Sequence, residues 1–138
     1  MCALRIKLTG QSASYHLIGR SVAGEHLFGD LEKEILSGML GKMARFCGME
    51  VITYCIMSNH FHVLVRVPEP QQLTDAQLLE RLEGLYGARG ALTRLAREAM
   101  TERGKIDEDI RRKLLERMGD VSAFMKELKQ RFSKWFNK

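Results

Sequence analysis

The segment from Met49 to Val67 constrains the fold of this chain more than any other part of the sequence. It reads MEVITYCIM, then Ser58-Asn59, then HFHVLVRV. The last eight residues are apolar at every second position, which predicts a strand with one buried face. The preceding apolar run predicts a strand covered on one side and partly on the other. With a tight turn between them and prolines after Val67, the two strands form a β-hairpin.

A strand and a helix are expected before this hairpin. Residues 14–22 (SYHLIGRSV) have the β-branched and aromatic composition of a strand, which Gly19 weakens. Apolar residues at helical spacing then predict a helix that begins at Asp30, its expected N-cap, and runs to Phe46. Gly48 is in the usual position for a glycine that ends a helix.

The rest of the chain has a helical pattern. Thr74 and Gln77 resemble a capping box, which opens the first of three short helices; the others are expected at 91–102 and 107–118. Asp120 is the expected N-cap of a last helix, whose apolar stripe favours core packing over the stacking of bases. That stripe consists of Val121, Phe124, Met125, Leu128, Phe132, Trp135 and Phe136.

The expected fold class is α+β. A strand, a helix and two strands followed by a helix form a ferredoxin-like β-α-β-β-α unit without its final strand. We expect one domain over residues 1–138, with a helical insertion at 70–119. In this topology the final strand pairs beside the first strand, so the outer edge of the first strand is expected to be uncovered.

Composition favours a soluble, cytoplasmic protein. Hydrophobic residues make up 45% of the chain and charged residues 28%, as in globular proteins. No apolar run is long enough to span a bilayer, and no signal peptide is recognised, so no membrane association is expected. Three cysteines show no metal-ligand spacing, and Cys47 and Cys55 are expected to be buried, reduced thiols.

Positive charge is concentrated at the C-terminal end. The net charge is +5, and residues 111–138 hold nine Lys/Arg against three Asp/Glu. Such a segment suits a polyanion such as nucleic acid, although a solvated helix face explains it equally well. The candidate contacts to DNA phosphates on the last helix are Lys126, Lys129, Gln130, Arg131 and Lys134.

His60 and His62 are the candidate metal ligands. Residues two apart on a strand point to the same face, so these two imidazoles project side by side. Together they can chelate one divalent cation if further ligands come from elsewhere in the fold. Two partly exposed histidines on a sheet surface are the alternative reading.

The sequence TYCIMSNHFHVLVRVP resembles the HUH strand of single-tyrosine transposases, especially the REP-associated tyrosine transposase branch. The Tyr15-His16 pair is similar to the opening strand of that family. FMKELKQRFSKWFNK, from Phe124 to Lys138, resembles the helix that follows the HUH strand. The resemblance covers about residues 13–68 and 120–138.

This resemblance implies a function in DNA transposition. In the family, a divalent cation on the HUH histidines polarises the scissile phosphate of single-stranded DNA, and a tyrosine attacks it to form a 5′-phosphotyrosine link. His60 and His62 would hold Mg²⁺ or Mn²⁺, of which Mn²⁺ suits imidazole better. The implied partners are single-stranded or hairpin DNA and a second copy of the chain.

The sequence departs from the family pattern at the nucleophile. The family tyrosine lies on a helix with a Tyr-Ile-x-x-Asn-Pro-like motif after a fourth strand, and neither element is found here. Tyr15, Tyr54 and Tyr86 are the only tyrosines, and packing is their expected use. We therefore expect the N-terminal, DNA-binding and metal-binding part of a transposase that is incomplete for catalysis.

His16 is a further candidate residue. If the ferredoxin-like strand order holds, His16 lies on the strand beside the HUH strand, where it contacts the DNA phosphate or, preferably, forms a hydrogen bond within the sheet.

Two other functions are open. The chain could instead be a nucleic-acid-binding regulator that uses the basic helix without metal. It could also be a metal-binding or oligomerising ferredoxin-like domain that does not bind DNA.

Overall fold

The structure, a computed structural model, describes residues 11–20 and 28–137 and has an α+β architecture, as predicted. Within these residues a three-stranded antiparallel sheet is combined with five helices. The elements are β1 (Ala13–Arg20), α1 (Asp30–Cys47), β2 (Glu50–Ile56), β3 (His60–Val67), α2 (Asp75–Tyr86), α3 (Ala91–Arg103), α4 (Glu108–Met118) and α5 (Val121–Phe136). The end of the strand predicted for residues 14–22 lies outside the described residues.

The strand order is β1-β3-β2, so β3 is the central strand. β1 pairs antiparallel with β3, with Leu17 opposite Val63. β2 pairs antiparallel with the other side of β3. This is the order that the ferredoxin-like prediction requires, and among the described residues no strand pairs with the outer edge of β1.

The hairpin of β2 and β3 is confirmed, but its first strand is far more exposed than predicted. The backbone N–H of Met57 donates to the carbonyl of His60 across the Ser58-Asn59 turn, at 2.8 Å. Ile52 and Tyr54 are 42% and 48% exposed, and Cys55 is exposed as well. The prediction that Cys55 is buried is therefore wrong, because β2 is an edge strand whose second face no described element covers.

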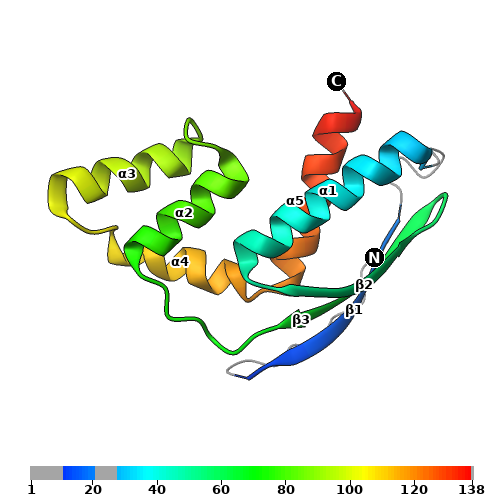
Figure 1. Ribbon diagram of the computed structural model, residues 1–138, viewed down its shortest axis with the longest axis horizontal. Coiled ribbons are helices and arrows are strands. Elements are labelled where there is room, and N and C mark those ends of the chain that lie inside the picture. Colours follow the sequence, from blue (N-terminus) through cyan, green and yellow to red (C-terminus); the bar gives the residue numbers. More distant parts are fainter. Residues whose placement is uncertain (1–10, 21–27, 138) are drawn as a thin grey trace.

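One face of the sheet carries the hydrophobic core. Leu17 of β1 and Phe61, Val63 and Val65 of β3 are almost fully buried. Figure 1 shows α1 and α5 on the same side of the sheet, and their apolar stripes belong to the same cluster as these strand residues. The predicted core role of the last helix is confirmed for Phe124, Leu128 and Phe132, which are buried, whereas Trp135 and Phe136 are partly buried against the core.

The helix ends follow the predicted capping residues in most places. Thr74 and Gln77 form the complete capping box at the start of α2. Asp120 is the N-cap of α5, as predicted, whereas Asp107, predicted as the first residue of its helix, is the N-cap of α4. The prediction for α1 is wrong by one residue, since Gly29 is the N-cap and Asp30 is the first helical residue. There the acidic side chain interacts with the helix dipole instead of the backbone N–H groups.

Gly48 ends α1 with a left-handed backbone, at φ 70°. The N–H of Gly48 donates to the carbonyl of Arg45, and the N–H of Met49 donates to that of Ala44. This pair of bonds is the Schellman motif, which satisfies two carbonyls at the helix end. It turns the chain directly into β2.

The helices between residues 70 and 119 pack into the same core as the sheet. Figure 1 shows α2, α3 and α4 gathered beside α1 and α5. Leu78 and Leu82 of α2 and Met118 of α4 are fully buried in the cluster that includes the sheet residues. The boundaries of the insertion stay a prediction, but its helices share one hydrophobic core with the rest of the described chain.

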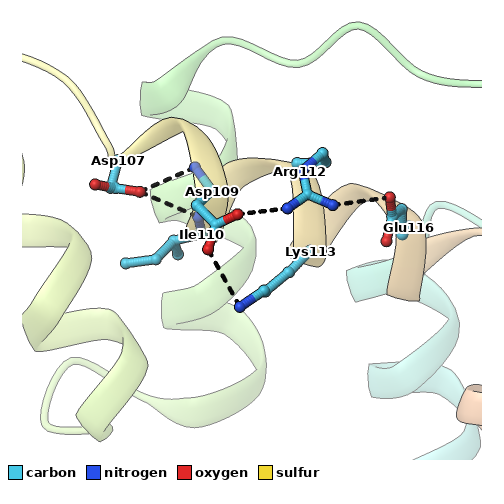
Figure 2. A network of polar contacts seen from close by, with 6 residues as sticks. All are labelled: Asp107, Asp109, Ile110, Arg112, Lys113 and Glu116. Carbon is cyan, nitrogen blue, oxygen red and sulfur yellow. Dashed lines mark hydrogen bonds and ion pairs between the residues drawn. The ribbon is translucent and has the colours of Figure 1, made fainter.

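The outer side of α4 is covered by a ladder of polar contacts, drawn in Figure 2. The Asp107 carboxylate accepts from the N–H groups of Asp109 and Ile110, which caps the helix. The side chains of Arg112 and Lys113 bind the carboxylate of Asp109. These hydrogen bonds lower the pKa of Asp109, chiefly through Arg112.

None of the helices in the described ranges combines the length and the apolarity needed to cross a bilayer.

Candidate functional site

His60 and His62 lie on the face of the sheet opposite the core. They alternate along β3 with the buried residues Phe61 and Val63, as the period of two requires. His16 and Arg20 of β1 are exposed on the same face. In the part of the chain that the structure describes, the helices cover only the other side of the sheet, so this histidine face is open.

The rings of His60 and His62 are close together. Their centroids are 5.1 Å apart and their planes are inclined by 75°. Two imidazoles that bind one ion at about 2.1 Å, with a ligand angle of about 90–110°, place their centroids roughly 5 Å apart. The separation of His60 and His62 therefore fits a shared divalent cation.

The Nδ1 atom of His60 is occupied by its neighbour in the hairpin turn. It lies 2.7 Å from Oδ1 of Asn59. An amide oxygen can only accept, so Nδ1 of His60 is the donor and carries the proton. In a neutral ring, Nε2 then has the lone pair that a metal ion requires.

The Nδ1 atom of His62 is occupied by His16. Nε2 of His16 lies 2.9 Å from it, and the two rings stack with centroids 5.1 Å apart and planes inclined by 23°. The strand order places His16 on the strand beside β3, as expected, and His16 forms a hydrogen bond within the sheet. Its specific partner, His62, was not predicted.

The described residues offer His60 and His62 as two candidate ligands, and no third His, Cys, Asp or Glu joins them in a metal-holding group. No group of three or more His, Cys, Asp or Glu side chains in residues 11–20 and 28–137 is arranged to hold a metal ion. Any cation at His60 and His62 would therefore complete its coordination with water, with phosphate oxygens or with groups from elsewhere. Such an open coordination sphere is characteristic of catalytic sites, in contrast to structural ones.

Arg20 is a residue that sequence reasoning missed. It is opposite His60 in the register between β1 and β3, and it is exposed on the histidine face. A guanidinium beside a metal site can bind a phosphate oxygen. The sequence could have indicated Arg20, because it is four residues after His16 and alternate residues of a strand point to the same face.

The three tyrosines are not on the histidine face. Tyr15 is paired with Val65 and Tyr54 with Val63, so both are on the core side of the sheet. The Tyr54 hydroxyl is 2.9 Å from the Ser37 hydroxyl on α1. Tyr86 is in the helical layer, where its hydroxyl contacts Glu127 and Arg117. Burial raises the pKa of Tyr86, which opposes its use as a nucleophile.

The candidate DNA contacts of α5 lie away from the histidines. α5 packs on the core face of the sheet through Phe124, Leu128 and Phe132, so its exposed side points away from β3. The exposed members of the set are Lys126, Gln130 and Lys134, and Lys129 is half-buried.

Arg131 differs from the rest of that set. Its guanidinium is paired with Glu127 at 3.1 Å and lies over the ring of Tyr86, with 5.1 Å between Cζ and the ring centroid. Arg131 therefore has a packing role between α5 and α2. A contact between Arg131 and DNA stays a prediction, as it does for the four other residues of α5.

The chain matches the profile of a known protein family. The profile of the family described as "Transposase IS200 like" matches residues 9–88, which is more than half of the chain. The matched range includes β1, α1, β2, β3 and α2, and it contains both histidines of β3. The curated proteins contain no match to the chain.

Proposed function

Because the chain belongs to the IS200-like transposase family, we propose that it is the DNA-binding, metal-binding module of a single-stranded DNA transposase. The observation that carries the proposal is the arrangement of His60 and His62. Their rings are 5.1 Å apart on an open sheet face, and the Nδ1 atom of each is engaged by a neighbour. The Nε2 atoms are therefore the atoms through which we expect the two rings to bind one ion.

The cation in this proposal is Mg²⁺ or Mn²⁺, held by His60 and His62. When bound, it supplies positive charge that offsets charge on the oxygens of a scissile phosphate. The protein contributes the open face on which a single strand can lie. Arg20 contributes a second positive charge at the end of β1, where it can orient the phosphate beside the histidines.

The nucleophile is not one of the three tyrosines in this proposal. Tyr15 and Tyr54 are on the opposite face of the sheet, and the hydroxyl of Tyr86 is held by Glu127 and Arg117. A nucleophile must reach the phosphorus atom beside the metal ion. We therefore expect this chain to bind DNA without forming a covalent bond to it.

The test is binding to a labelled DNA hairpin with a single-stranded flank, with and without Mn²⁺. Wild type is compared with His60→Ala/His62→Ala, and the samples are also run on a denaturing gel. We expect Mn²⁺ to strengthen binding to wild type only, with no covalent adduct. Absence of DNA binding at any salt concentration would refute the proposal, and an adduct would show that a tyrosine of this chain is reactive.

A regulator that binds nucleic acid through α5 is the second candidate. The observation that favours it is the separation of Lys126, Gln130 and Lys134 from the histidine face. A protein using only this side would bind DNA equally well with and without metal. The same experiment distinguishes the two functions, because DNA binding that is unaffected by Mn²⁺ and by the double histidine variant supports the regulator.

Dimer formation is part of the main proposal. No strand of the described residues lies beside the outer edge of β1, and a strand at the edge of a sheet can accept a strand from another chain. Light scattering at increasing concentration should show a mass of two chains. A single-chain mass at the highest concentration would contradict this part of the proposal without affecting the metal site.

A further inference from the structure

We propose that Asn59 and His16 are positioning residues, which select Nε2 of His60 and of His62 as the metal-binding atoms. This inference rests on the proposed function, because it concerns the same two histidines. It concerns the position of the proton on each neutral ring, which decides which of the two nitrogens has the lone pair that a metal ion needs.

Asn59 determines the tautomer of His60. Its side-chain oxygen accepts a hydrogen bond from Nδ1 of His60 at 2.7 Å. Asn59 is in the two-residue turn that the bond from Met57 to His60 closes, so its backbone position is fixed relative to the ring. Keeping the proton on Nδ1 leaves the lone pair on Nε2. Without Asn59 the ring could carry its proton on Nε2, and it could not bind a cation through that atom.

His16 has the corresponding role for His62. At 2.9 Å from Nδ1 of His62, Nε2 of His16 excludes a metal ion from that position. When Nε2 of His62 binds the ion, the proton of the neutral ring is on Nδ1, and it is donated to the lone pair of His16. The stacking of the two rings holds the plane of His62 in the same orientation.

The two partners come from different parts of the fold. Asn59 belongs to the turn between β2 and β3, whereas His16 belongs to β1 on the other side of β3. Each histidine is thus engaged at Nδ1 by a residue outside the pair, which leaves Nε2 of each ring as the atom for a metal ion. Partners of this kind fix the tautomer and orientation of a ligand, and their removal typically weakens metal binding about 10- to 100-fold.

The first experiment uses the metal-free protein. Long-range ¹H–¹⁵N correlations identify the protonated nitrogen of each ring, at a pH where the ¹⁵N shifts show neutral rings. We expect the proton of His60 on Nδ1 in wild type and in Asn59→Asp, which keeps an oxygen acceptor. In Asn59→Leu we expect a mixture of tautomers, and Ser58→Ala in the same turn serves as the matched control.

The second experiment adds Zn²⁺, which is diamagnetic and binds imidazole well. In wild type we expect a proton on Nδ1 of His62 and a metal-shifted Nε2. His16→Leu should weaken Zn²⁺ binding about 10- to 100-fold. His16→Gln should restore most of the affinity, because its side-chain oxygen can accept at the place of Nε2. Ser14→Ala, on the same face of β1, is the control.

The two proposals fail in different ways. If wild type binds no metal ion while Nδ1 of His60 carries the proton, the proposed function fails, and only the effect of Asn59 on the tautomer of His60 stands. If metal binds but Asn59→Leu and His16→Leu change neither the tautomers nor the affinity, the positioning roles are wrong. Equal losses in His16→Leu and His16→Gln would also overturn the role of His16 as an acceptor.

Discussion

At the scale of single residues, the absence of a side chain at Gly19 gives the ring of Phe61 the space to pack against β1. The two residues are opposite each other in the register, and both are buried. A Cβ atom at position 19 would be 2.4 Å from Cε1 and Cζ of that ring. The glycine that weakens β1 as a strand is therefore required by the packing of the core.

Gly19→Ala should lower the free energy of unfolding by about 1–3 kcal/mol, because the added Cβ atom would overlap the buried ring of Phe61. Urea denaturation followed by circular dichroism measures this change. Gly38→Ala is the matched control, since a Cβ atom there meets nothing within 4 Å. In that helical position alanine should stabilise the protein by about 0.5–1 kcal/mol. Equal effects of the two substitutions would contradict the packing argument.

The two described cysteines should differ strongly in reactivity. Burial raises the pKa of Cys47 from 9.0 to about 12, whereas Cys55 is exposed. In a Cys2→Ser variant at pH 8, a thiol reagent should label only Cys55 until the protein is unfolded, as peptide mass spectrometry would show. Because the raised pKa keeps the thiol of Cys47 protonated in the folded protein, its contribution to the free energy of unfolding is complete below pH 9.0. That contribution is lost as the pH rises toward 12. Equal labelling of both cysteines in native protein would disprove the difference.

At the scale of elements, Arg81 connects α2 to the end of α1. Its guanidinium donates to the carbonyl of Phe46 at 3.2 Å and to the side-chain oxygen of Gln71 at 2.8 Å. Gln71 in turn donates to the carbonyl of Cys47 at 2.9 Å. Carbonyls at the C-terminal end of a helix have no partner within the helix. The half-buried Arg81 thus supplies a donor for a carbonyl at the end of α1, and it holds α2 against that end.

Arg81→Met should lower the free energy of unfolding by about 1–3 kcal/mol, because it leaves a partly buried carbonyl without its donor. Arg112→Met is the matched control, since Arg112 is exposed and makes only the surface contacts of Figure 2. Exposed ion pairs contribute little, so its denaturation midpoint should stay that of wild type. A larger loss in Arg112→Met than in Arg81→Met would contradict the assigned role of Arg81.

At the scale of the whole molecule, the helical layer separates two surfaces that could bind DNA. The histidine face is on one side of the sheet, and the exposed side of α5 is on the far side of the core. Phosphate contacts on α5 would add affinity without sequence information. A DNA molecule that contacts both surfaces must pass around an edge of the protein, which a hairpin with a single-stranded flank can do.

Lys126→Gln/Lys134→Gln should weaken DNA binding about equally for all sequences. The slope of log affinity against log salt should decrease by about 0.7 for each lost contact to a single strand. Zn²⁺ affinity should not change, because neither lysine is near β3. Lys113→Gln on α4, which removes a lysine paired with Asp109, is the control. An unchanged salt slope in the double lysine variant would show that α5 does not contact DNA.

Much of the fold follows from the sequence because it depends on local geometry. The alternation in HFHVLVRV places His60 and His62 on the face opposite Phe61 and Val63 in any sheet. Helical spacing and capping residues predict the helices in the same way, and Thr74 with Gln77 forms the box that the sequence suggests. The order of these elements is sufficient to predict an α+β fold with β1 beside β3.

Only the tertiary structure decided which surfaces are covered and which side chains meet. The apolar run of β2 favours a covered strand, yet β2 is at the edge of the sheet and Cys55 is exposed. The contact of His16 with His62 joins residues 46 positions apart, and that of Tyr86 with Glu127 joins residues 41 apart. Backbone geometry sets the face to which a side chain points. The neighbours of that side chain depend on how elements distant in the sequence pack together, which a local sequence pattern does not predict.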